Sequence, residues 1–146
     1  MSDPAAAAEL ARRVVDQMLE HDAFSRWLGL TVSDLRPGHC LAQMTIRPDM
    51  VNGFGVCHGG VPYSLADSAL AFASNSHGRL SLLIESNMSY PEKVQVGDVL
   101  TATADEVSCT NRLGTYNVAV RNQHGTLIGQ FRGTVYRTAK DHFPAG

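Results

Sequence analysis

One stretch of this chain, from Gly59 to Ser76, reads as a helix that is small and apolar on nearly every side. Its only charged residue is Asp67, and a few serines and Asn75 interrupt the apolar run. A helix without a broad polar face is usually surrounded by the rest of its protein. The chain is therefore expected to wrap its other elements around this segment. Ionising a carboxylate in such surroundings is costly unless something compensates.

The sequence on both sides of this helix predicts strands. Apolar and polar residues alternate between positions 40 and 47, after a Pro37-Gly38 turn that suits a hairpin. Four more strands are expected after the helix, at 81–90, 98–109, 114–122 and 126–137. The short breaks between the last three indicate antiparallel hairpins. One buried helix within a run of five or six strands predicts an α+β fold rather than an alternating βαβ order.

The chain is expected to form a single domain over residues 1–146, because this length suits one compact unit. An N-terminal helix is expected at about 4–20, since Pro4 lies near its start and apolar residues follow at four-residue spacing. The core is expected over about 25–138, and the polar tail 139–146 is expected to be frayed. No segment has the order of a signal peptide or the length of a membrane span.

Composition excludes several classes of partner. There are 12 basic and 14 acidic residues, and the net charge of −2 argues against a nucleic-acid partner. Three scattered cysteines show no Cys-x-x-Cys spacing and indicate reduced thiols of a cytoplasmic protein. Of these, Cys57 is interpreted as a packing residue rather than a nucleophile. The six histidines form no metal-ligand pattern, so neither a metal nor another cofactor is expected.

Gly59 and Gly60 lie where the loop before the helix turns into its first turn. The N–H groups of a first turn have no partner within the helix, and the positive end of the helix favours negative charge there. Glycine lets a ligand approach the backbone closely. A backbone N–H near Gly59 is therefore a candidate to hold the oxyanion of an acyl-transfer reaction. The alternatives are that the glycines only shape a turn and that Asp67 is a hydrogen-bonded structural residue.

The spacing of the two groups predicts a dimer. Gly59 and Asp67 are eight residues apart, which is about 12 Å along a helix axis. A carboxylate that far away cannot act on a carbonyl held at the start of its own helix, since catalysis needs contacts of about 3 Å. Two antiparallel copies of the helix around a two-fold axis would bring each Asp67 near the other Gly59.

The run Asn52-Gly-Phe-Gly-Val-Cys-His58-Gly59-Gly60, followed by Leu-Ala-Asp67, resembles the hotdog-fold acyl-CoA thioesterases, and most closely their PaaI-type branch. The resemblance covers roughly residues 25–138. It implies a curled antiparallel sheet around one long central helix, with sites shared across a dimer interface. It also implies that Asp67 is the nucleophile or general base, that Gly59 gives the oxyanion N–H, and that Asn52 orients substrate or water.

Further site residues are predicted around these three. His58 and Gly60 are expected to contact substrate at the helix entry, where His58 resembles a hydrogen-bonding residue. Arg112, in the loop before Gly114, is the candidate for the CoA phosphates. Aromatic residues that are candidates to line the pocket are Phe54, Tyr63, Phe72 and Tyr90.

The function that this resemblance implies is hydrolysis of acyl-CoA thioesters, with phenylacetyl or ring-hydroxylated phenylacetyl groups as the expected substrates. Dimers of this family commonly pair into tetramers. A non-catalytic acyl-CoA-binding protein of the same fold is the alternative, although such a protein gains nothing from an unpaired carboxylate beside the acyl carbonyl. A hotdog dehydratase is a weaker alternative, because those enzymes use a catalytic histidine within a Phe-Pro-rich entry loop.

Overall fold

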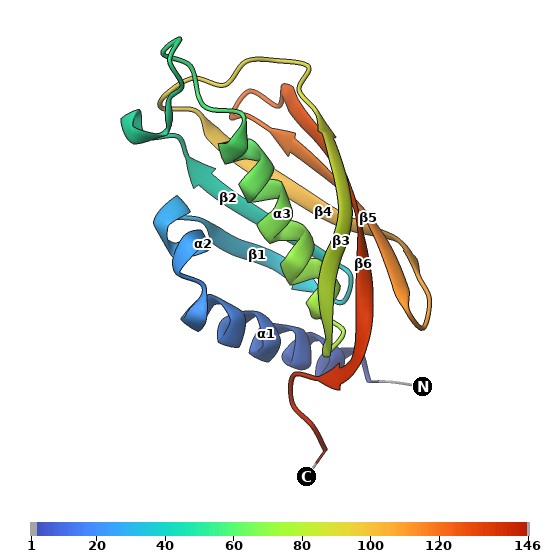
Figure 1. Cartoon of the computed structure of the whole chain (residues 1–146). Coiled ribbons are helices and arrows are strands. Elements are labelled where there is room, and N and C mark those ends of the chain that lie inside the picture. Colours follow the sequence, from blue (N-terminus) through green and yellow to red (C-terminus); the bar gives the residue numbers. More distant parts are fainter. Residues whose placement is uncertain (1–2, 146) are drawn as a thin grey trace.

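A computed structural model describes residues 3–145 of the chain (Figure 1). Two helices come first, α1 (Pro4–His21) and α2 (Ala23–Leu28), and the long helix α3 (Gly60–Asn75) lies in the middle of the chain. The strands are β1 (Thr31–Arg36), β2 (His39–Thr45), β3 (Arg79–Ser89), β4 (Val99–Cys109), β5 (Leu113–Arg121) and β6 (Leu127–Asp141). A single turn of 3-10 helix, η1 (Pro48–Met50), leads into the loop before α3. No helix in this part of the chain combines the length and the apolar character needed to cross a bilayer.

The strands form one antiparallel sheet in the order β1-β2-β4-β5-β6-β3. β3 follows α3 in the chain but pairs with β6, at the edge of the sheet opposite to β1. The sheet curls around α3, which contacts all six strands (Figure 1). This arrangement confirms the predicted α+β fold, in which a curled antiparallel sheet surrounds one central helix.

α3 is buried as its composition predicts. Leu65, Leu70 and Phe72 are fully buried, and each side chain of this size contributes about 1.5–3 kcal/mol when it leaves water. β6 packs against the helix at Gly133, where an added Cβ would lie 2.5 Å from Leu70 Cδ1. A side chain at this position would have to displace the ends of the Leu70 and Leu83 side chains, which favours glycine here.

The expected N-terminal helix is present as α1, but the expectation of a frayed tail from residue 139 is wrong in part. β6 continues to Asp141, which pairs with Arg79 at the start of β3. The His142 N–H then donates to the Gly78 carbonyl at 2.8 Å, and His142 Nε2 lies 2.7 Å from Asn75 Oδ1. His142 thus hydrogen-bonds to the end of α3 and to the turn that follows it, so the polarity of this segment does not by itself indicate disorder.

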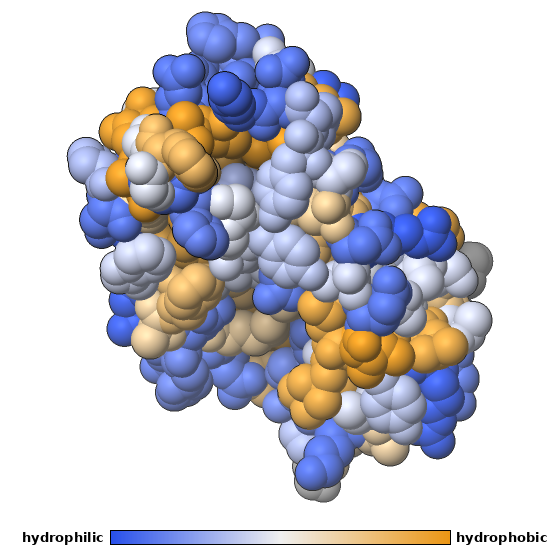
Figure 2. Space-filling view, turned by 45° about the horizontal axis from the view of Figure 1, so that its top comes forward, coloured by the Kyte–Doolittle hydropathy of each residue, from blue (hydrophilic) through white to orange (hydrophobic). Residues whose placement is uncertain are grey.

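β3 forms a free edge of the sheet, with β6 as its partner among the described strands. Its residues Leu82, Leu83 and Ile84 are 55%, 37% and 59% exposed. Because consecutive side chains of a strand point to opposite faces, this edge exposes apolar groups on both sides. On the face shown in Figure 2, apolar side chains gather in separate patches between polar ones. An apolar free edge is a template for pairing with another chain.

Candidate active site

The loop between η1 and α3 is closed by its own hydrogen bonds. Val51 and Cys57 form an isolated antiparallel bridge, and the Asn52 N–H donates to the Val56 carbonyl at 2.8 Å. Asn52 Oδ1 accepts from the Phe54 N–H, also at 2.8 Å. Asn52 therefore shapes the loop that leads to α3, a common use of asparagine in turns. Its part in orienting substrate or water stays a prediction.

His58 is a hydrogen-bonding residue at the entry of α3, as the sequence predicts. Its Nδ1 accepts from the Gly60 N–H at 2.9 Å, and its carbonyl accepts from the Val61 N–H at 3.0 Å. An added Cβ on Gly60 would lie 3.0 Å from this Nδ1, closer than an ordinary contact. Gly60 thus makes room for His58, while substrate contacts of these two residues stay a prediction.

Gly59 keeps an N–H that has no hydrogen-bond partner among residues 3–145. Its φ of −58° is ordinary helical backbone, and an added Cβ would meet the Tyr90 ring at 3.7 Å, an ordinary contact. Among the described residues, neither strain nor packing requires glycine here. The remaining explanation for glycine at this position is that a ligand can approach the N–H closely. The Tyr90 hydroxyl donates to the Gly59 carbonyl at 2.9 Å and so fixes this peptide.

An open cavity of about 620 Å³ lies beside Gly59. Its walls come from residues 56–62 and from the segment 90–95, which follows β3. Tyr90 lines this cavity, as the sequence suggested, whereas Phe54 is exposed and Phe72 belongs to the core. Two charged residues that line the cavity, Glu92 and Lys93, were not predicted from the sequence. The sequence of residues 90–95 has no pattern that predicts its return to the start of α3.

Cys57 lines the same cavity, yet its thiol is poorly suited to attack a carbonyl. Burial, and then the negative charge of Asp98, raises the pKa of Cys57 to about 11. The thiolate is the nucleophilic form of cysteine, and at neutral pH this thiol remains protonated. The environment therefore supports the packing role predicted for Cys57.

Asp67 lies half-buried in the middle of α3 and is not among the residues that line the cavity beside Gly59. Burial raises the pKa of Asp67 above its ordinary value, and the negative charge of Asp22 raises it further. No hydrogen bond or ion pair to its carboxylate is found among the described residues. A carboxylate with a raised pKa is typical of general bases that work near neutral pH.

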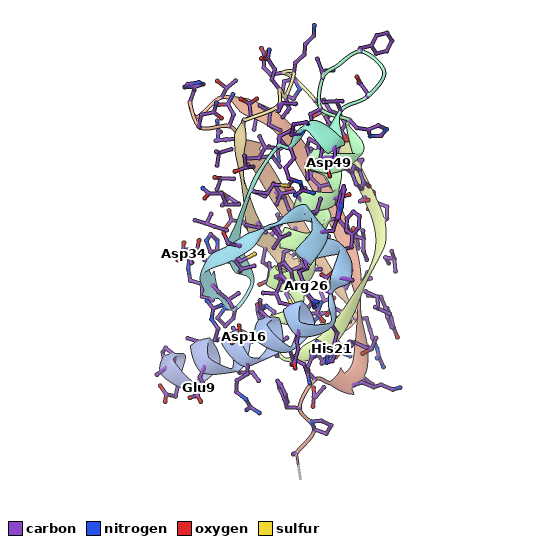
Figure 3. The ribbon with its side chains drawn as sticks, turned by 90° about the vertical axis from the view of Figure 1, so that its left-hand side faces the viewer. Glu9, Asp16, His21, Arg26, Asp34 and Asp49 are labelled. Atoms are coloured by element: carbon purple, nitrogen blue, oxygen red, sulfur yellow. The ribbon has the colours of Figure 1, made fainter. Side chains whose placement is uncertain are left out.

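Asp22 reaches α3 through a chain of hydroxyl groups. Its Oδ1 accepts from the Ser25 N–H at 2.9 Å and caps α2, and its Oδ2 accepts from the Ser25 hydroxyl at 2.6 Å. Ser25 Oγ in turn lies 3.0 Å from the Oγ of Ser68, the residue after Asp67. Figure 3 shows α1 and α2 crossing in front of α3. This network was missed from the sequence, because the two segments lie far apart in the chain.

Replacing Asp22 with Asn is expected to move the acid limb of the rate profile to lower pH. The substitution removes a negative charge that opposes ionisation of Asp67, and asparagine still caps a helix. Because burial is the larger cause of the raised pKa, the limb should move only part of the way toward an ordinary aspartate. The measurement is kcat/KM as a function of pH, with Asp16→Asn on the exposed face of α1 as the control. If the acid limb does not move in the Asp22 variant, or moves equally in the control, Asp22 does not influence the pKa of Asp67.

Arg112 lies in the loop between β4 and β5. Figure 1 shows this loop at the opposite end of α3 from the loop that leads into the helix. Arg79, just after the end of α3, donates to Asn111 Oδ1 in the same loop at 3.3 Å. α3 has 16 residues and is about 24 Å long. Within one chain Arg112 and Gly59 are therefore at opposite ends of α3, and only a second copy can bring them together.

Comparisons with known proteins show the family to which the chain belongs. The family model described as Thioesterase superfamily matches residues 54–128, a stretch that contains both Gly59 and Asp67. The chain belongs to the thioesterase superfamily.

Similar proteins place it more closely within the thioesterases. A putative esterase of Archaeoglobus fulgidus is 37% identical, over 94% of this chain and 89% of its own. The acyl-coenzyme A thioesterase PaaI of Escherichia coli K12 is 34% identical, over 82% of this chain and 86% of its own. The solved structure of the E. coli PaaI protein from the phenylacetic acid degradation operon has a TM-score of 0.90 at 31% identity, covering 92% and 98% of the two chains. The protein is a thioester hydrolase of the PaaI-type hotdog group, which disfavours the alternatives of a binding module and a dehydratase.

Proposed function

We propose that this PaaI-type thioesterase hydrolyses acyl-CoA, with phenylacetyl-CoA and its ring-hydroxylated forms as the preferred substrates, in phenylacetate degradation. The observation that carries the proposal is the free N–H of Gly59, which lies beside an open cavity. Gly59 caps the helix that also contains Asp67. The name of the E. coli relative supports the acyl-CoA class. Pro62 and Tyr90 supply apolar wall for an aryl group, and no cofactor enters the reaction.

In the proposed reaction the thioester carbonyl oxygen accepts a hydrogen bond from the Gly59 N–H. Negative charge builds up on this oxygen as the nucleophile adds, and the N–H stabilises it. Asp67 either takes a proton from the attacking water or attacks the carbonyl carbon itself, in which case water opens the resulting anhydride. The C–S bond breaks and the CoA thiolate takes up a proton. One water is consumed, and the free acid and CoA are released.

Each site is proposed to be built from two chains. Gly59 and Asp67 lie about 12 Å apart along one helix, so a single thioester cannot contact both groups of one chain. We infer that a second copy pairs along the apolar edge of β3, with the two α3 helices antiparallel. The carboxylate of one copy then meets the free N–H of the other.

The same pairing gives Arg112 a role. With antiparallel helices, the β4–β5 loop of one copy approaches the start of α3 in the other, where the Arg112 guanidinium would bind CoA phosphates. Two such dimers are proposed to form a homotetramer.

A cytoplasmic location is also proposed. Cys40, Cys57 and Cys109 are all free thiols, and the first two are buried. Free thiols of this kind suit a reducing compartment.

A thiol-release assay over a panel of aryl and aliphatic acyl-CoAs tests the substrate class. We expect kcat/KM for phenylacetyl-CoA and its hydroxylated forms to exceed that for aliphatic chains by about tenfold or more, since one or two methylenes of misfit in a pocket have effects of this size. Asp67→Asn serves as the blank. Preference for aliphatic chains would overturn the aryl class, and release from no acyl-CoA would overturn the proposed function itself.

A further inference from the structure

At the end of α3 opposite to Gly59, three side chains of different chemistry meet. His77 follows α3, and Glu106 and Cys109 lie on β4. An imidazole nitrogen, a carboxylate oxygen and the thiol sulfur all lie within 4.8 Å of one another. His77 Nε2 and Glu106 Oε1 lie 2.8 Å apart. Thiol, imidazole and carboxylate are the three ligand types that zinc takes in proteins.

An irregularity in β4 brings Glu106 and Cys109 onto one face of the strand. Residues three apart in a regular strand point to opposite faces, so Glu106 and Cys109 would normally diverge. The register between β4 and β5 shifts between Glu106 and Ser108, which inserts one residue and turns Cys109 toward the face of Glu106. Bulges of this kind re-aim side chains, and they are over-represented beside functional sites.

A second layer of residues holds the carboxylate in place. The hydroxyl of Tyr116, which is 1% exposed, donates to Glu106 Oε1 at 2.7 Å. Gly114 of β5 pairs with Cys109 of β4. An added Cβ on Gly114 would lie 3.1 Å from both the Tyr116 ring and Val135. The absence of a side chain at Gly114 therefore keeps Tyr116 in its place. Fixing a ligating carboxylate by an outer hydrogen bond is typical of metal sites.

The cluster is open to solvent on the side of His77. An open cavity of about 560 Å³ lies between the start of α1 and the turn that joins β1 to β2, and Pro37, Ser76 and His77 line it. His77 is the one member of the cluster that lines this cavity, so it is the side from which an ion would approach.

We propose that His77, Glu106 and Cys109 bind one Zn²⁺, with water as the fourth ligand. Zinc binds N, O and S at about 2.0–2.3 Å in a tetrahedron, so its ligands lie about 3.5 Å apart, and small side-chain rotations reach this spacing from the present one. The carboxylate and the thiolate neutralise the charge of the ion, and the thiol proton is released on binding. Burial and the negative charge of Glu106 raise the pKa of Cys109, and the positive charges of Arg137 and Arg79 offset only part of this rise.

The proposed zinc ties the end of α3 to β4. In one chain it is separated from Gly59 by the length of α3, about 24 Å, so it takes no part in thioester hydrolysis at the Gly59 of the same chain. The spacing of residues 77, 106 and 109 along the chain matches no zinc-ligand motif, since the three residues meet only through the fold and the bulge in β4. This explains why the sequence predicted no metal.

Metal analysis of the whole protein tests the site. Chelator-treated protein, dialysed against micromolar Zn²⁺, should bind one zinc per chain and melt several degrees higher than the metal-free protein, because a ligand that binds only the folded state stabilises it. With Co²⁺ as probe, a thiolate-to-cobalt charge-transfer band should appear. Cys109→Ser should lose this band, and both Cys109→Ser and His77→Gln should lose the zinc-dependent rise in Tm.

His124→Gln is the matched control, since His124 lies exposed in the turn between β5 and β6, and it should bind zinc like the wild type. Because Cys109 is exposed, its serine variant is expected to fold even if His77→Gln does not. Absence of zinc in the wild type, or full zinc binding by Cys109→Ser, would overturn the proposal. Loss of zinc in the His124 control would overturn it as well, because binding would then lie elsewhere.

Discussion

Asp67→Asn is expected to lose roughly 10²–10⁴-fold in turnover, the usual cost of losing a general base. If Asp67 is an obligatory nucleophile, the loss is larger. Asparagine keeps the volume of the side chain but removes its basicity and most of its nucleophilicity. Since the carboxylate makes no hydrogen bond or ion pair with the described part of the chain, its removal breaks no contact there.

The same variant is expected to melt at a higher temperature than the wild type at neutral pH. The pKa of Asp67 is raised in the folded chain above the ordinary value of 3.8, so the unfolded chain releases this proton first. Stability from the group is therefore fully present below the unfolded pKa and is lost as pH rises through the folded pKa. Asparagine does not ionise and escapes this loss. The gain in Tm should vanish at acid pH, where the wild-type carboxyl is protonated in both states.

Turnover from thiol release, melting curves from acid to neutral pH and the oligomer size by chromatography check these expectations together. Retention of more than about a third of wild-type turnover would rule out general-base or nucleophilic action by Asp67. A variant less stable than the wild type at neutral pH would show that the carboxylate has a stabilising partner in the assembled protein. Higher stability with lost activity is the usual signature of a residue kept for function.

The features that were predictable from the sequence are those that depend on local pattern. α3 follows from one continuous apolar run, and the strands follow from alternation and turn residues. The helix entry at His58 and the distance between Gly59 and Asp67 are also set by neighbouring positions along the chain. These features needed no knowledge of which strands pair.

The features that were missed depend on contacts between distant segments. Asp22 influences Asp67 only because α1 and α2 cross over α3. Lys93 reaches the cavity because the segment after β3 returns to the start of α3. β6 is longer than its polar end suggested, since Arg79 pairs with Asp141 across the edge. Register and strand order decide such contacts, and no short stretch of sequence contains them.

Two inactive variants, when mixed, should restore about a quarter of wild-type activity if each site draws on two chains. The variants are Asp67→Asn and Gly59→Pro. Gly59 suits proline because its φ is −58°, close to the fixed proline value. Its N–H has no partner within the described chain, so proline removes the proposed oxyanion donor without breaking an internal hydrogen bond. Each variant alone should be nearly inactive.

Recovery follows from the composition of the mixed dimer. The chain altered at Asp67 still offers an intact Gly59, and the chain altered at Gly59 still offers an intact Asp67. One of the two sites is then wholly wild type, and the other carries both changes. After free exchange about half of the dimers are mixed, and one of the two sites in each mixed dimer is active. The expected activity is therefore about a quarter of the wild-type value.

A double variant gives the matched control. When Asp67→Asn is mixed with the chain that carries both Asp67→Asn and Gly59→Pro, every site lacks the carboxylate and no activity should return. Mass spectrometry must show that mixed dimers formed, and melting curves must show that both single variants are folded. If no activity returns under those conditions, each chain holds its own complete site. The 12 Å separation along α3 would then have to be bridged within one chain, which the present geometry does not allow.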